Sequence, residues 1–72
     1  MQRQHAERLA GKLRTRYPEL LIEVYQDGFR GRRWLVNIYD PKSGALYEVE
    51  GDGEAQQAVE KCPTRHMAQA QR

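Results

Sequence analysis

The sequence has a single cysteine, Cys62, and no long run of hydrophobic residues. One thiol cannot form an internal disulfide, which excludes a disulfide-stapled secreted domain. No apolar stretch reaches membrane-spanning length, and the first five residues lack the apolar core of a signal peptide. These absences predict a cytoplasmic protein with no membrane partner.

Residues that commonly carry chemistry are also scarce. His5, His66 and Cys62 are too few and too scattered for a zinc site, and the only serine, Ser43, falls in a predicted turn. A chain of 72 residues forms one domain, and such a small domain leaves little room for an enclosed substrate pocket. We therefore expect a non-enzymatic binding module with no metal and no cofactor.

Charge is nearly balanced overall but unevenly placed along the chain. The net charge is +2, yet residues 1–39 are mostly basic and residues 40–62 mostly acidic. This distribution predicts a bipolar molecule, and the alternative is a mixed, solvated surface.

The most informative stretch is Asp-Pro-Lys-Ser-Gly at residues 40–44, set between two apolar runs. Pro41 presets φ for a tight turn, and Gly44 takes the left-handed conformation that closes a short hairpin loop. The Asp40 side chain accepts a hydrogen bond from the turn backbone ahead of it. The stretch therefore predicts a β-hairpin.

Hydrophobic periodicity assigns the remaining elements. It predicts a helix over residues 3–17, strands over 20–26, 33–39 and 45–50, and a second helix over 53–62 capped by Asp52. The predicted fold class is α+β, with an N-terminal helix packed on a three-stranded antiparallel sheet and a short C-terminal helix (αβββα). We expect a single domain over 1–72, with an ordered core at 3–62 and a partly flexible tail at 63–72.

Alternation along the strands defines two apolar sheet faces. The face expected to pack on the first helix comprises Ile22, Val24, Trp34, Val36, Ile38, Tyr47 and Val49. The opposite, outer face comprises Tyr25, Leu35, Tyr39 and Leu46, with Leu21 at its margin. Antiparallel sheets usually keep one face polar, so a second apolar face needs a cover. The cover is the second helix or the tail, a protein partner, a second copy of the chain, or bases stacked on Tyr25 and Tyr39.

Two basic segments are candidate contacts. The loop at residues 27–33 carries Phe29, Arg30, Arg32 and Arg33, a set suited to gripping acidic side chains or phosphates. The first helix carries Arg8, Lys12, Arg14 and Arg16, which with the loop form a candidate nucleic-acid surface. The alternative for both segments is a solvated charged surface.

One acidic run, at Glu48, Glu50, Asp52 and Glu54, follows the third predicted strand. Oxygen ligands at alternate positions bind hard cations weakly, but the calcium-loop pattern is absent. A solvated edge is the better interpretation of this run.

The order of elements resembles a known family. The resemblance is carried by residues 34–39, the turn, residues 46–51 and residues 54–58. It is to the double-stranded RNA-binding domain, it covers residues 3–62, and it implies the same helix–meander–helix architecture. That family places phosphate-binding lysines at the start of its last helix, whereas the matching residues 51–57 are acidic here. The family's first-loop contact maps onto residues 28–33.

The sequence therefore predicts a small binding module that modulates or inhibits a larger protein or nucleoprotein partner, a size typical of phage and mobile-element regulators. The expected contacts are Arg30, Arg32, Arg33, Phe29, Tyr25, Leu35 and Tyr39. The alternative is an RNA- or DNA-binding protein that uses the basic helix and the arginine-rich loop. A homodimer through the outer sheet face is a third expectation, because a two-fold interface uses the same patch twice.

Overall fold

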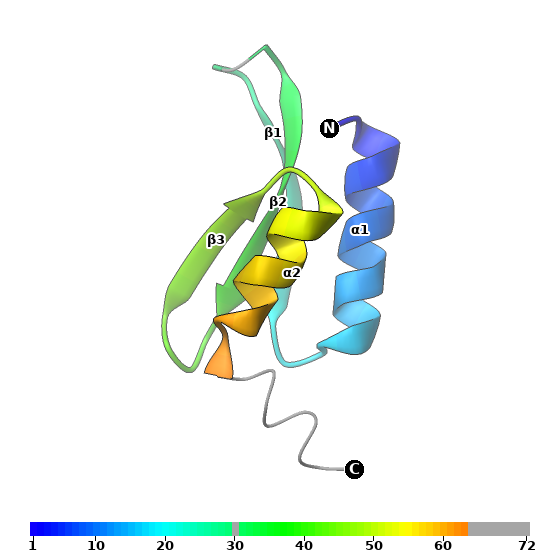
Figure 1. The fold of residues 1–72 in the computed structure, drawn as a ribbon. Helices are drawn as coiled ribbons and strands as arrows, with labels where there is room; N and C mark the ends of the chain where they lie inside the picture. The colour runs from blue at the N-terminus through cyan, green and yellow to red at the C-terminus, as the bar shows by residue number, and fades with distance from the viewer. Residues whose placement is uncertain (30, 64–72) are drawn as a thin grey trace.

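The computed structural model describes residues 1–29 and 31–63. Its elements are α1 (Arg3–Arg16), β1 (Leu21–Asp27), β2 (Arg33–Asp40), β3 (Ala45–Val49) and α2 (Asp52–Glu60) (Figure 1). The αβββα prediction is confirmed. The tail expected to be partly flexible lies, apart from Pro63, outside the described residues.

The three strands form one antiparallel sheet in the order β1-β2-β3. Val36 at the centre of β2 faces Val24 on β1 and Val49 on β3. The β2–β3 turn has the predicted chemistry: the Lys42 N–H donates to Asp40 Oδ1 at 2.9 Å, and Gly44 has φ 77°. The turn residues thus set the register of the second hairpin.

Helix α1 forms because its apolar residues recur on one stripe. Ala6, Leu9, Ala10 and Leu13 of this stripe are all buried. The helix ends at Arg16, two residues before Pro18, because a residue that precedes proline is pushed out of helical geometry. At its other end Arg3 lies 5.7 Å above the Trp34 ring.

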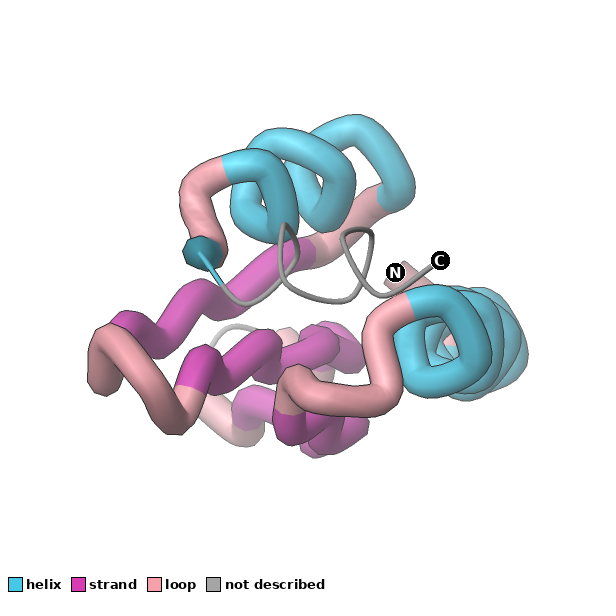
Figure 2. The backbone as a smooth tube through the Cα atoms, turned by 90° about the horizontal axis from the view of Figure 1, so that it is seen from below, coloured by secondary structure: helices cyan, strands magenta, loops and turns pink. Residues whose placement is uncertain are grey.

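Both helices pack on the same face of the sheet (Figure 2). Val36 and Ile38 on β2 are fully buried beneath them, in one cluster with Leu9 of α1 and Val59 of α2. Burial of side chains of this size contributes about 1.5–3 kcal/mol each. Helix α2 was one of the candidates for covering the outer face. It packs on the inner face and therefore does not cover the outer one.

The start of α2 differs from the prediction. Gly51 is the N-cap and makes no side-chain cap, and Asp52 is the first helical residue. The Asp52 carboxylate instead contacts α1, where it pairs with His5 at 3.0 Å and Lys12 at 3.5 Å. Glu54, in the first turn of α2, satisfies a backbone group that precedes the helix, because its carboxylate accepts the N–H of Glu50 at 2.8 Å. Asp52 thus joins the two helices and does not cap one of them.

The N-terminal segment, residues 1–16, also supplies hydrogen-bond partners to backbone groups of the sheet. Arg14 donates from Nη2 and Nε to the Ile22 carbonyl of β1, at 2.8 and 3.2 Å. The Met1 carbonyl accepts the N–H of Trp34 at 3.1 Å, beyond the point where β3 ends. The N-terminal segment therefore holds both ends of the β1–β2 hairpin stem.

Candidate functional site

The outer face of the sheet is organised as rows that cross the strands. The first row joins Leu21, Tyr39 and Leu46, which are direct cross-strand neighbours. Leu21 and Leu46 are 56% and 59% exposed, and Tyr39 is half-buried between them. We call these three residues the apolar row. An exposed apolar strip across a whole sheet is a feature of interaction surfaces.

The next row is acidic. Glu23, Asn37 and Glu48 are cross-strand neighbours, and both glutamates are exposed. The Tyr25 hydroxyl on β1 donates to the Glu48 carboxylate on β3. The hydrogen bond between Tyr25 and Glu48 therefore spans the central strand. On that strand the Asn37 Oδ1 atom is buried and has no hydrogen-bond partner among the described residues.

Leu35 is the one residue assigned to the outer face whose side chain is buried. Only 5% of Leu35 is exposed, because it pairs directly with Tyr25, whose side chain reaches across β2 toward Glu48. The predicted contact of Leu35 with a partner stays a prediction, although little of this side chain is accessible. Leu35 packs within the sheet, while Tyr25 and Tyr39 stay half-buried at the surface.

The β1–β2 hairpin tip, described at residues 28, 29, 31 and 32, extends past the N-terminal end of α1 (Figure 1). Phe29 is 100% exposed, and its N–H is held by Asp27 Oδ1 at 3.0 Å. Arg32 is exposed and has φ 60°, a left-handed conformation that is unfavourable for a residue with a side chain. Arg30, the third predicted contact here, lies outside the described residues.

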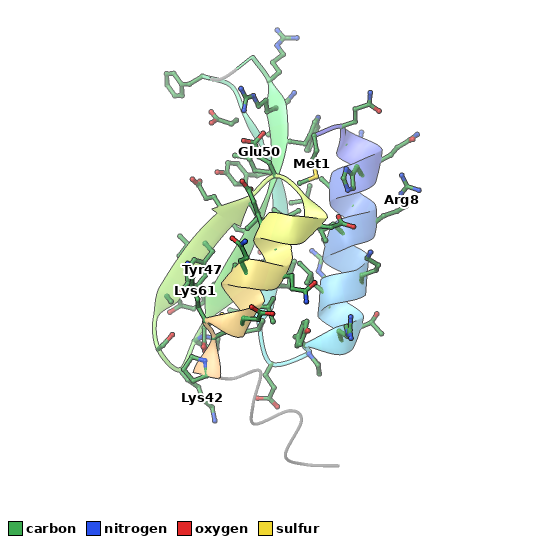
Figure 3. All side chains as sticks on the ribbon, viewed as in Figure 1. Met1, Arg8, Lys42, Tyr47, Glu50 and Lys61 are labelled. Carbon is green, nitrogen blue, oxygen red and sulfur yellow. The ribbon has the colours of Figure 1, made fainter. Side chains whose placement is uncertain are left out.

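Arg33 follows the hairpin tip, and its guanidinium forms an ion pair with Glu50. Its Nη1 atom lies 3.0 and 3.1 Å from the two carboxylate oxygens of Glu50. The N-terminal amino group is 3.9 Å from the same carboxylate (Figure 3). Arg33 is therefore already paired, and a ligand phosphate would have to compete with Glu50.

The four predicted cations of α1 are divided between different sides of the helix. Arg14 reaches the backbone of β1, Lys12 pairs with Asp52 on the side of α2, and Arg8 points away from the sheet (Figure 3). Arg16 lies at the C-terminal end of the helix, whereas the β1–β2 hairpin extends past the opposite end (Figure 1). The structure thus does not gather these residues into one strip.

Each member of the acidic run has a partner within the described chain. Glu48 accepts from Tyr25, Glu50 pairs with Arg33, and Glu54 caps backbone. The pKa of Asp52 is held below its ordinary value by the hydrogen bond from His5 and by the nearby Lys12 charge. Among residues 1–29 and 31–63, no group of three or more metal-ligating side chains comes together.

A groove of about 480 Å³ separates the two helices. Its apolar floor includes Leu13 and Val59, and Lys12, Arg16 and Asp52 stand at its rim. The sequence did not indicate this groove, because the side on which the second helix packs was not fixed by its own pattern.

Within the described part of the chain, no helix has both the length and the apolar character to cross a bilayer. Comparison with protein-family models, curated proteins and solved structures finds no match to this chain. The functional argument therefore rests on the geometry of its surfaces.

Proposed function

We propose that this protein is a non-enzymatic module that binds a protein partner through the outer face of its sheet and so modulates or inhibits a larger assembly. One observation carries the proposal. Both helices pack on the inner face, and Leu21 and Leu46 are left more than half exposed on either side of Tyr39. Covering such apolar surface yields roughly 25 cal/mol per Å² removed from water.

The neighbouring acidic row defines the chemistry of the partner. Glu23 and Glu48 lie directly beside the apolar row. Carboxylates at this position repel the phosphates of a nucleic acid and attract lysine or arginine side chains. The surface therefore suits a protein that presents an apolar ridge flanked by basic residues, as a free protein or within a nucleoprotein complex.

Affinity capture with matched variants tests this proposal. The double variant Leu21→Lys/Leu46→Lys places two charges on the apolar row, and Gln4→Lys/Gln56→Lys adds the same charge at exposed helix positions as a control. We expect a captured partner to survive nuclease treatment, to be retained by the control, and to be lost by about tenfold or more with the row variant. Circular dichroism confirms that both variants are folded.

Three results contradict the proposal. Capture that disappears with nuclease points to nucleic acid, and capture that is insensitive to the row variant points to another surface. A native protein that sediments as a dimer and becomes a monomer in the row variant shows that a second copy of the chain covers this face.

A second candidate function, nucleic-acid binding, is favoured by the fully exposed Phe29 and the exposed Arg32, which belong to the same hairpin tip. An aromatic ring and a guanidinium on one exposed loop suit stacking on an unpaired base and a contact to a phosphate. Phe29→Ala/Arg32→Ala should then weaken binding to single-stranded RNA or DNA and reduce its salt dependence. Absence of any gel shift at low salt removes this candidate.

A further inference from the structure

Among the described residues, none pairs its backbone with the outer edge of β3. Residues of an antiparallel ladder alternate between bonding one neighbouring strand and the other. The Ile22 carbonyl of β1 points away from β2, toward α1, so its partner Ile38 directs its backbone groups to β3. Because Ile38 pairs with Tyr47, the flanking Leu46 and Glu48 direct their N–H and C=O groups out of the sheet.

The β3 edge is short and carries the charged Glu48, but it lacks three other devices that protect a terminal strand, namely proline, lysine and a β-bulge. The strand reads Ala-Leu-Tyr-Glu-Val, with no proline and no lysine, and its paired residues follow one another without a bulge. Within the described chain no further strand lies beside it. At the other edge, by contrast, Arg14 occupies the Ile22 carbonyl.

A groove of about 450 Å³ runs beside the same edge, between β3 and α2. Its β3 wall contains Tyr47 and Glu48, and its α2 wall contains Glu54, Ala58 and Lys61. A channel between an edge strand and a parallel-lying helix is the geometry in which an extended segment adds to a sheet.

The two ends of this groove carry opposite charge. Glu54 stands at the end where β3 finishes, since its carboxylate accepts the N–H of Glu50. Lys61 stands at the end where β3 begins, and its ammonium lies 5.9 Å from the centre of the Tyr47 ring (Figure 3). A segment that runs antiparallel to β3 complements Glu54 with a cationic side chain near its amino end and Lys61 with an acidic side chain near its carboxyl end.

We propose that the β3 edge binds an extended segment of a protein partner as an antiparallel fourth strand. Its backbone pairs with Leu46 and Glu48. Its side chains that face α2 are a cation beside Glu54, a small apolar residue over Ala58 and an acid beside Lys61. This site uses backbone groups and the α2 side of β3, so it shares with the apolar row only Leu46, through the backbone of that residue.

A designed peptide of the sequence Thr-Lys-Thr-Val-Thr-Glu-Thr, blocked at both ends, tests the proposal by two-dimensional NMR of the full chain. The lysine, valine and glutamate alternate so that all three face α2 when the segment runs antiparallel to β3. We expect saturable shifts centred on Leu46, Glu48 and the α2 wall, and about tenfold slower amide exchange at Leu46 and Glu48.

Two peptide controls separate backbone pairing from side-chain attraction. N-methylation of the two threonines that flank the valine keeps every side chain and removes the N–H groups that face the edge. We expect it to weaken binding by about tenfold or more, because two hydrogen bonds are lost. The peptide with lysine and glutamate exchanged keeps the composition and should bind several-fold less tightly.

Variants of the chain complete the test. Leu46→Pro removes the outward N–H at a position where an edge strand tolerates proline, whereas Leu46→Ala keeps it. We expect Leu46→Pro to abolish binding and Leu46→Ala to retain it. Glu54→Gln keeps the backbone cap, removes the charge and should weaken binding several-fold, which provides a measure that does not depend on proline tolerance.

Several results overturn the proposal. They are the absence of peptide binding, equal binding of the N-methylated peptide, equal binding by Glu54→Gln, or concentration-dependent protection of Leu46 and Glu48 without peptide, which assigns the edge to a second copy. Leu21→Lys should leave peptide binding unchanged. The failure of this site and the failure of the outer-face proposal are therefore distinguishable.

Discussion

The central strand β2 has two faces with different fates. On its inner face Val36 and Ile38 are fully buried beneath two helices. On its outer face Leu35 is 5% exposed although α1 and α2 both pack on the opposite face, whereas Tyr39 remains half-buried. The comparison shows that side chains from neighbouring strands bury part of a sheet face without a second layer. Tyr25 does so for Leu35, whereas Leu21 and Leu46 of the apolar row stay more than half exposed.

The largest effect should come from the inner face. Ile38→Ala leaves a cavity at a fully buried position and should lower the free energy of unfolding by about 3 kcal/mol. Urea denaturation followed by circular dichroism measures this change. The control Leu46→Ala, on the apolar row, should cost no more than about 0.5 kcal/mol. Equal costs at the two positions would show that the outer face is covered after all.

Leu35 sharpens the comparison because it lies on the outer face but is buried. Leu35→Ala should cost about 2 kcal/mol, well above the value for Leu46→Ala. In a double-mutant cycle with Tyr25→Ala the two changes should be non-additive, since the Tyr25 side chain covers Leu35. Strict additivity would mean that Leu35 is buried by something other than Tyr25.

The hairpin tip should respond in the opposite direction. Arg32 holds φ 60°, a conformation that glycine adopts without the steric cost of a Cβ atom. Because this gain exceeds the added entropy of the unfolded chain, Arg32→Gly should raise the free energy of unfolding by about 0.5–1 kcal/mol. Thermal unfolding measures this rise, with Arg8→Gly as a helical control that should lower stability. A loss of stability with Arg32→Gly would contradict the assigned conformation.

The smallest effect concerns the contact between the helices. The hydrogen bond from His5 and the Lys12 charge lower the pKa of Asp52 below its ordinary value of 3.8. A lowered pKa stabilises the fold above the unfolded-state value and loses this contribution as the pH falls through the folded-state value. Asp52→Asn should therefore reduce the loss of stability between about pH 5 and about pH 2. An unchanged acid limb would show that the contact adds nothing.

Much of the fold was predictable from local chemistry. The Asp40 and Gly44 turn fixed a register in which Tyr39 faces Leu46, and strand alternation then separated the two faces. Asp52 was assigned as a cap because its residue type favours that position, but tertiary contacts with His5 and Lys12 engage it instead.

The candidate surfaces were harder to predict than the fold. The alternation rule placed Tyr25 and Leu35 on the outer face, but it did not reveal that one covers the other. The four cations of α1 were grouped because one predicted helix carries them, but the helix directs them to separate sides. Arg33 pairs with Glu50, and Lys12 pairs with Asp52. The partners in each pair are far apart in the chain, so no local sequence pattern predicts that they meet.

The Arg14 contact to β1 has a consequence for assembly. A strand added beside β1 must first displace a guanidinium from the Ile22 carbonyl, whereas β3 accepts a strand without displacing any described group. The sheet therefore resembles a chain-terminating monomer in a polymerisation. Once a strand has added at the β3 edge, the β1 edge opposes the addition of another strand. Edge-to-edge growth into fibrils, which requires both ends, is thereby suppressed by one arginine.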